Sequence, residues 1–260
     1  MNKLVLLLLS ASLLPGQTIR PADPASSVAT VTQSQVFTRI ISGGGWETSI
    51  VLLNTSSAPV AFSQLFVAQD STPRQFSVRS QADGSVLTTA GLQATLNPSS
   101  SLTFVLFDNG SPTQEAWSLL SYDASQGKLG GYAIVRHRAL GGSFSFETTV
   151  PLSNMQDYSV HVPFDNTQGF RTQLTLVNPA SNLPAQVNLT YTTPQGQIML
   201  MDSLSLQPGQ QMTISLPDTY PDLANTAGTI SVEGNINRLS VFGLRYNDAY
   251  GAIAAVPTIN

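Results

Sequence analysis

The sequence contains no cysteine, only two lysines and few charged residues of any kind. Without cysteine the chain can form no disulfide, no thiolate metal site, no cysteine nucleophile and no lipid-modified cysteine anchor. Charged residues occupy 10% of the 260 positions, against roughly 25% in an average soluble domain. The net charge of -4 is spread over scattered side chains. Because no basic patch is present to neutralise successive phosphates, we expect no nucleic-acid partner.

The polar positions are filled instead by Ser, Thr, Asn and Gln, and 42% of the residues are hydrophobic. That content is enough for one large core or for two cores of about a hundred residues each. Thr and Val suit a pleated strand surface, whereas Lys and Glu, which are common on exposed helix faces, are scarce. The composition therefore favours strands.

The N-terminus has the order of a secretory signal peptide. Lys3 precedes a largely apolar stretch from Leu4 to Leu14, and a polar stretch begins at Pro15. A membrane anchor is the alternative, but the apolar stretch is shorter than the roughly twenty residues needed to span hydrocarbon as a helix. We expect a signal peptide over residues 1–17, a flexible leader over 18–35, and an exported protein, secreted or at the cell surface, with no membrane span after signal removal.

Four blocks of sequence recur in the same order in the two halves of the chain, which indicates an internal duplication. The pairs are Trp46–Asn54 with Phe170–Asn178, Leu92–Pro98 with Asp202–Pro208, Tyr132–His137 with Val241–Tyr246, and Val150–Pro151 with Val256–Pro257. The offset between the halves falls from 124 at the first pair to 110 at the second. The first half therefore carries an insertion, which we place between Asp70 and Gly91.

Within each half, apolar residues alternate at period two in short runs separated by Gly, Pro, Asn, Asp and Ser clusters. This pattern is typical of strands and turns. A single short helical turn is predicted at 219–223. The fold expected is all-β, with two tandem Ig-like antiparallel β-sandwich domains from an internal duplication, at residues 36–153 and 158–260.

Three short motifs support this fold by resemblance: Asn178-Pro179-Ala180, the strand end from Leu204 to Gly209, and Gly243-Leu244-Arg245. They resemble repeated Ig-like β-sandwich modules of exported bacterial proteins of uncharacterised function. The resemblance covers both halves, and the second half matches better because Thr55 and Ile134 depart from the pattern in the first. It implies a fold and export, and it implies no activity and no functional residues.

No catalytic or metal-binding signature stands out. The only histidines, His137 and His161, lie in apparent strands, no Gly-x-Ser-x-Gly motif occurs, and the glutamates are isolated. We therefore predict no catalytic residues, no metal, no cofactor and no enzyme activity. An unrecognised hydrolase stays open as a third hypothesis, which requires His137 or His161 beside both a serine and a carboxylate in one cleft.

Three aromatic residues are candidates for ligand binding: Trp46, Trp117 and Tyr132. Exposed rings on a sandwich supply binding energy to sugars and other ligands, although Trp46 and Phe170 open the same strand in the two halves and could instead close the core. We predict an exported, non-catalytic structural or adhesion-like binding module, with a protein or a glycan at the cell surface as possible partners. A carbohydrate-binding module is the alternative. Arg136 and Arg245 also match between the halves and are expected to pair with a carbonyl or carboxylate.

Overall fold

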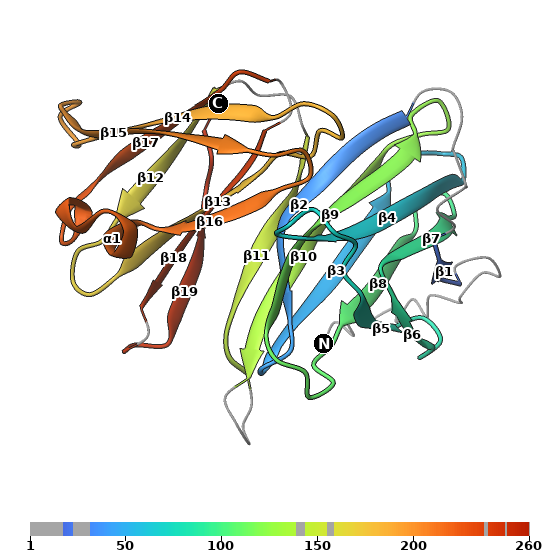
Figure 1. Cartoon of the computed structure of the whole chain (residues 1–260). Coiled ribbons are helices and arrows are strands. Elements are labelled where there is room, and N and C mark those ends of the chain that lie inside the picture. The colour runs from blue at the N-terminus through green and yellow to red at the C-terminus, as the bar shows by residue number, and fades with distance from the viewer. Residues whose placement is uncertain are drawn as a thin grey trace, which may run out of the picture.

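The computed structural model is all-β, with antiparallel sheets and one short helical segment. It describes residues 18–22, 32–138, 144–154, 159–236, 239–247 and 249–259. The predicted signal peptide, residues 1–17, lies outside this range. The strands form two lobes that lie side by side (Figure 1). We call them the N-lobe, up to Asn154, and the C-lobe, from Ser159.

The N-lobe is a β-sandwich whose two layers belong to one continuous 11-stranded sheet, in the order β1-β7-β4-β9-β2-β11-β10-β3-β8-β5-β6. Its strands are β1 (Arg20–Pro21), β2 (Thr32–Ser42), β3 (Trp46–Asn54), β4 (Val60–Ala68), β5 (Phe76–Ser80), β6 (Val86–Thr89), β7 (Gly91–Leu96), β8 (Ser101–Leu106), β9 (Gln114–Asp123), β10 (Leu129–Arg138) and β11 (Phe144–Asn154).

The C-lobe has two four-stranded sheets, in the orders β12-β17-β14-β15 and β16-β13-β18-β19. Its elements are β12 (Ser159–Asp165), β13 (Arg171–Val177), β14 (Ala185–Thr192), β15 (Ile198–Leu206), β16 (Gln211–Ser215), α1 (Leu216–Thr219), η1 (Pro221–Leu223), β17 (Ala227–Gly234), β18 (Ser240–Asn247) and β19 (Ala252–Val256). The helical turn predicted at 219–223 overlaps α1 and η1. The observed helix begins earlier, at Leu216, because Pro217 fits the first turn of a helix.

The same strand order runs through both lobes. In the N-lobe β7-β4-β9-β2 is followed by β11-β10-β3-β8, and in the C-lobe β15-β14-β17-β12 is matched by β19-β18-β13-β16. In the N-lobe, β2 pairs with β11 and so joins the two layers. In the C-lobe, an isolated bridge connects His161 of β12 to Ile259, which follows β19. The hairpin β5–β6 has no counterpart among the described C-lobe strands, and it lies inside the predicted insertion.

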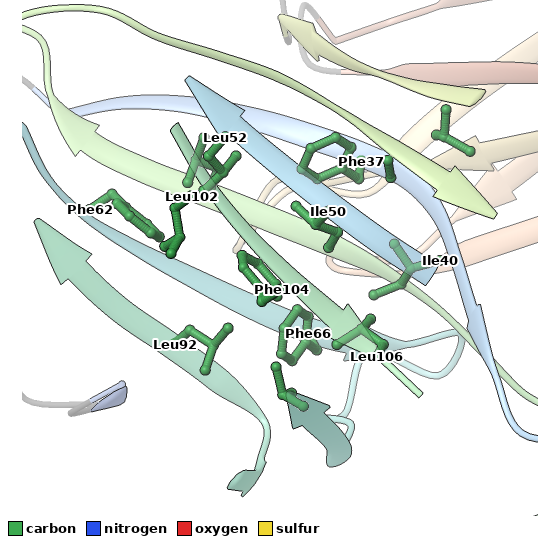
Figure 2. Packing of buried hydrophobic residues seen from close by; sticks show 14 of the residues in the cluster. Phe37, Ile40, Ile50, Leu52, Phe62, Phe66, Leu92, Leu102, Phe104 and Leu106 are labelled. Atoms are coloured by element: carbon green, nitrogen blue, oxygen red, sulfur yellow. The ribbon is translucent and has the colours of Figure 1, made fainter. Parts of the chain in front are cut away.

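The inward half of the strand alternation builds two apolar clusters, and the one that fills the N-lobe extends to Phe242 and Leu244 of the C-lobe. In β4 the buried Phe62 and Phe66 alternate with the exposed Leu65. Figure 2 shows that the N-lobe core is filled between two layers, with Phe62 and Phe66 of one strand facing residues such as Ile50 and Phe104. The C-lobe core is a separate cluster around Leu174, Leu189, Tyr191 and Val232.

The predicted leader, residues 18–35, contributes strand to the fold. Thr32 to Gln35 already belong to β2 and pair with β9. Arg20 and Pro21 pair with β7 at the edge of the sheet, and Ile19 is buried in the core with only 3% of its surface exposed. The prediction of a flexible leader was therefore wrong at both described ends. The two-residue strand β1 has no periodic signal to read, and β2 begins in a polar stretch before its apolar residues.

Candidate functional site

The lobes are joined by a seam in which β2, β9 and β11 of the N-lobe meet β13, β16, β18 and β19 of the C-lobe. The indole nitrogen of Trp117 donates a 2.9 Å hydrogen bond to the carbonyl of Gly209. Around the ring, Val36 and Val177 form a small apolar cluster with no exposed surface. Trp117 is 2% exposed, so this predicted ligand candidate contacts the opposite lobe and presents no ring to solvent.

Buried polar contacts also cross the seam. The Thr38 and Ser240 hydroxyls lie 2.7 Å apart. The Gln211 amide donates to the carbonyls of Thr38, at 2.7 Å, and Ala116, at 3.2 Å. Because an unpaired buried polar group costs about 1–3 kcal/mol, these pairs favour one relative placement of the lobes over others. The seam therefore fixes the lobes against each other.

Arg39 lies where the seam opens to solvent. Its guanidinium is 2.8 Å from the carboxylate of Glu115 and donates to Gln173 across the seam at 2.8 Å. Glu115 in turn accepts a hydrogen bond from Thr213 of the C-lobe. The charge of Arg39 is thus balanced by an N-lobe carboxylate, and both side chains are held in place from both lobes.

A cleft of about 160 Å³ opens beside Arg39, between the lobes. We call it the interlobe cleft; its lining combines aromatic, aliphatic and uncharged polar side chains with one arginine. The lining residues are Arg39, Trp46, Phe146, Gln173, Leu244, Tyr246, Asn247, Ala252 and Ile253. Its volume is below the roughly 300–1,000 Å³ of sites for drug-sized ligands, so it suits a single ring or one side chain of a larger partner.

Trp46 forms the N-lobe wall of the interlobe cleft. Its ring centroid is 4.7 Å from that of His137 and 5.4 Å from that of Phe146, and the His137 and Phe146 rings are stacked at 5.0 Å. Trp46 is partly buried and also packs against the N-lobe core. Both interpretations of Trp46, core plug and ligand contact, are therefore compatible with its place.

Phe170, which the sequence blocks align with Trp46, has a different neighbour. The Arg245 guanidinium carbon lies 3.5 Å above the centre of its ring, and the same guanidinium donates to Asp165 at 2.6 Å. Partial burial works against ionisation of Asp165, but hydrogen bonds from Thr167 and the nearby Arg245 hold the pKa of its carboxyl below the ordinary value. The predicted pairing of Arg245 with a carboxylate is confirmed, as is that of Arg136, which contacts Glu147 at 2.8 Å.

Tyr132, the third aromatic candidate, lies on the outer face of the N-lobe. It pairs across the sheet with Val51 and with Pro151, and 39% of its surface is exposed. The three candidates therefore lie in three different surroundings: a closed seam, a cleft wall and an open sheet face. Only Trp46 shares a concave site with polar side chains.

The two histidines differ in their surroundings. His137 is part of the aromatic group beside Trp46. The Nδ1 atom of His161 lies 2.9 Å from the Ser231 hydroxyl, on an exposed strand face that does not line the interlobe cleft. This contact gives the hydrolase hypothesis a serine beside a histidine, and neither residue lines the interlobe cleft.

The residues that the structure describes contain no group of three or more His, Cys, Asp or Glu side chains arranged to hold a metal ion. They also contain no helix with the length and apolar character needed to cross a membrane.

Sequence reasoning missed Arg39, Gln173 and Gln211, which organise the seam. Arg39 and Gln173 are polar residues of β2 and β13, and an outward polar side chain of a strand is ordinarily solvated. One available signal was the sequence of β2, in which apolar residues follow one another without the alternation of a half-exposed strand. In the structure every residue from Gln35 to Ser42 is buried, on both faces of the strand, and the core of one lobe covers only one face. A strand buried on both sides requires a second covering layer.

Comparisons with known proteins identify no family. No protein-family model matches the chain, and no curated protein matches it. Among solved structures, vicilin from Corylus avellana (hazelnut) is similar over 75% of this chain and 74% of its own, at 6% identity and a TM-score of 0.20. A similarity at that score carries no argument about fold or function.

Proposed function

We propose that the protein is an exported, non-catalytic binding module whose ligand occupies the interlobe cleft. The observation that carries this proposal is the pre-formed cleft itself: Trp46 and Phe146 of one lobe face Leu244 and Tyr246 of the other. The lobes that form it are joined by buried hydrogen bonds. A site that is already ordered loses less conformational entropy on binding.

The duplication is part of the same proposal and is supported by matching polar contacts in the two lobes. The Asn54 amide donates to the Ala58 and Leu96 carbonyls, at 2.8 and 3.0 Å. The Asn178 amide donates to Leu183 and Leu206, at 2.8 and 3.1 Å. Leu96 and Leu206 are the residues that the sequence blocks align. The shared strand order agrees with this, and on this proposal the lobes are two copies of one Ig-like sandwich.

Export is proposed from the sequence of residues 1–17, in which a lysine precedes an apolar stretch too short to span a membrane as a helix. An extracytoplasmic setting also agrees with the absence of lysine-rich or other basic patches for intracellular nucleic acid. Partners on this proposal are proteins or glycans met outside the cytoplasm.

The alternative to a general binding role is a carbohydrate-binding module. The lining of the interlobe cleft supports this alternative. Aromatic walls of Trp46 and Tyr246 suit the apolar face of a sugar ring, and the Gln173 and Asn247 amides lie beside them. Trp117, by contrast, is closed off by Gly209.

The test uses Trp46 as its own reporter. In a Trp117→Phe variant, Trp46 is the single tryptophan, and its emission is followed while ligands selected on glycan and peptide arrays are added. We expect a change in emission on binding. Isothermal titration calorimetry, which needs no tryptophan, should show weaker binding after Gln173→Ala or Trp46→Leu. Tyr250→Ala, at a side chain that is 76% exposed in the C-lobe, is the matched control. Array ligands that bind without changing Trp46 emission, and that bind both cleft variants as tightly as the wild type, would overturn the proposal.

A further inference from the structure

A second cleft, of about 200 Å³, lies at one end of the N-lobe sandwich. We call it the insertion cleft, because four of its lining residues come from the insertion that distinguishes the N-lobe from the C-lobe: Gln75, Phe76, Ser77 and Thr88. The remaining lining residues are Ser42, Gly43, Phe107, Asn109, Ser111 and Gln114. The proposal made here does not depend on the interlobe cleft.

The walls of the insertion cleft are cross-strand pairs that present polar side chains. Ser77 and Thr88 face each other on the hairpin β5–β6, and Ser42 faces Gln114 where β2 meets β9. Neighbouring side chains on paired strands point to the same side of the sheet. The hairpin and the β2–β9 pair therefore supply hydroxyls and a carboxamide from two directions.

The loop after β8 completes the rim and is held by its own hydrogen bonds. The Asn109 amide donates to the Ser77 hydroxyl at 2.8 Å, and the Ser111 hydroxyl donates to Asn109 at 2.5 Å. Ser42 donates to the Phe107 carbonyl at 3.0 Å. The polar side chains of the rim are thus oriented before any ligand arrives.

The apolar part of the cleft consists of two phenylalanines. Phe76 is 2% exposed and packs edge-on against Phe66, with ring centroids 5.6 Å apart. The Arg79 guanidinium lies over the Phe107 ring, 5.2 Å from its centre. The neighbouring Asp108 carboxylate accepts hydrogen bonds from the backbone of Gly45 and Gly110 and is not among the lining residues.

The lining residues contain hydroxyls and carboxamides and no ionisable side chain. Among the lining side chains a charged ligand would find no counter-charge for the hydration it loses, and the Arg79 guanidinium beside the cleft already lies over Phe107. A purely apolar ligand would leave the polar rim unpaired. Hydroxyl groups that both donate and accept match such a rim. From this chemistry we infer that the insertion cleft binds a neutral saccharide ring, with hydroxyls to the rim and an apolar face toward Phe107.

The test is a nitrogen-15 NMR titration of the full chain. The neutral probes are methyl glucoside and cellobiose, glucuronate and glucosamine are the charged analogues, and cyclohexanol is the apolar one. We expect at least one neutral saccharide to shift the backbone amides of Gly43 and Ser111 and to leave those of Gly196 and Gly251 in the C-lobe in place. The charged and apolar probes should bind on the order of tenfold more weakly.

Two variants make the assignment specific. Gln114→Leu and Gln75→Leu each remove one carboxamide at nearly constant volume, and each should weaken saccharide binding on the order of tenfold. If one variant fails to fold, the other still decides the outcome, and Gln195→Leu in the C-lobe is the matched control. Trp46→Phe should leave this binding unchanged, which separates it from the interlobe cleft. Neutral saccharides that shift none of the cleft amides, or that bind both glutamine variants with unchanged affinity, would overturn the inference.

Discussion

Trp117 and Gly209 are 92 residues apart in sequence and are joined by a hydrogen bond between the indole nitrogen of one and the carbonyl of the other. The contact connects β9 of the N-lobe to the turn before β16 of the C-lobe. It lies beside the buried pair of Thr38 and Ser240. The lobes therefore share a buried boundary, and they should unfold as one cooperative unit.

Trp117→Ala should destabilise the protein by about 3–5 kcal/mol, because it leaves a cavity in the seam and an unpaired Gly209 carbonyl. Urea unfolding followed by circular dichroism measures the change. The control is Tyr250→Ala, whose exposed side chain should cost less than about 0.5 kcal/mol. Equal effects of the two substitutions would contradict the seam described above.

Asn54→Ala and Asn178→Ala should each cost about 1–3 kcal/mol. The first leaves three backbone carbonyls without their amide donor and the second leaves two. Both asparagines are at most 2% exposed. Thermal unfolding of both variants is compared with that of Asn188→Ala, an exposed position in the same lobe as Asn178. If the two positions are structural equivalents, their costs should agree closely; a large cost at one and none at the other would argue against equivalence.

Asp165 should make the free energy of unfolding depend on pH in the acidic range. Its pKa is lowered in the folded protein, as Thr167 and Arg245 outweigh the effect of partial burial. A carboxyl with a depressed folded pKa contributes stability above its unfolded pKa, near 3.8, and loses it as pH falls through the lower folded value. The difference in unfolding free energy between wild type and Asp165→Asn should therefore shrink below about pH 4. A difference that stays constant down to pH 2 would refute this assignment.

Tyr220 should titrate late in alkaline solution. The pKa of Tyr220 is raised to about 12. Burial is the main cause, and the hydrogen bond that the hydroxyl donates to Asp202 is the second. Since the protonated form is favoured in the folded state, its stabilising effect is complete below pH 10 and is lost as pH rises toward 12. Asp202→Asn should lower the midpoint, measured by tyrosinate absorbance against Tyr220→Phe as the blank. An unchanged midpoint would show that the carboxylate has no part in the shift.

The strands were largely predictable because their signal is local. The block from Trp46 to Asn54 coincides with β3, and the all-β class follows from period-two alternation and turn residues. The sequence blocks align Asn178 with Asn54, and in the structure Asn54 ends β3 while Asn178 directly follows β13. What these patterns report is which side of a strand faces a core.

The seam was not predictable from the same patterns, because it covers the outer face of strands whose inner face is already buried. Trp117 was a candidate for ligand contact as an aromatic ring expected to be exposed, and the C-lobe buries it. Gln211 and Thr38 lie 173 positions apart, and a single polar residue carries no local sign of so distant a partner. The interlobe cleft forms only where the two lobes dock, so the sequence could not predict it either.

The joined lobes also have a kinetic consequence. Two-lobed proteins that close around a ligand show an association rate that levels off as ligand concentration rises, because a slow closing step becomes limiting. Here Thr38, Gln211 and Trp117 hold the two walls of the interlobe cleft together before any ligand is present. Capture at that cleft should be a single step, with an observed rate that stays proportional to ligand concentration.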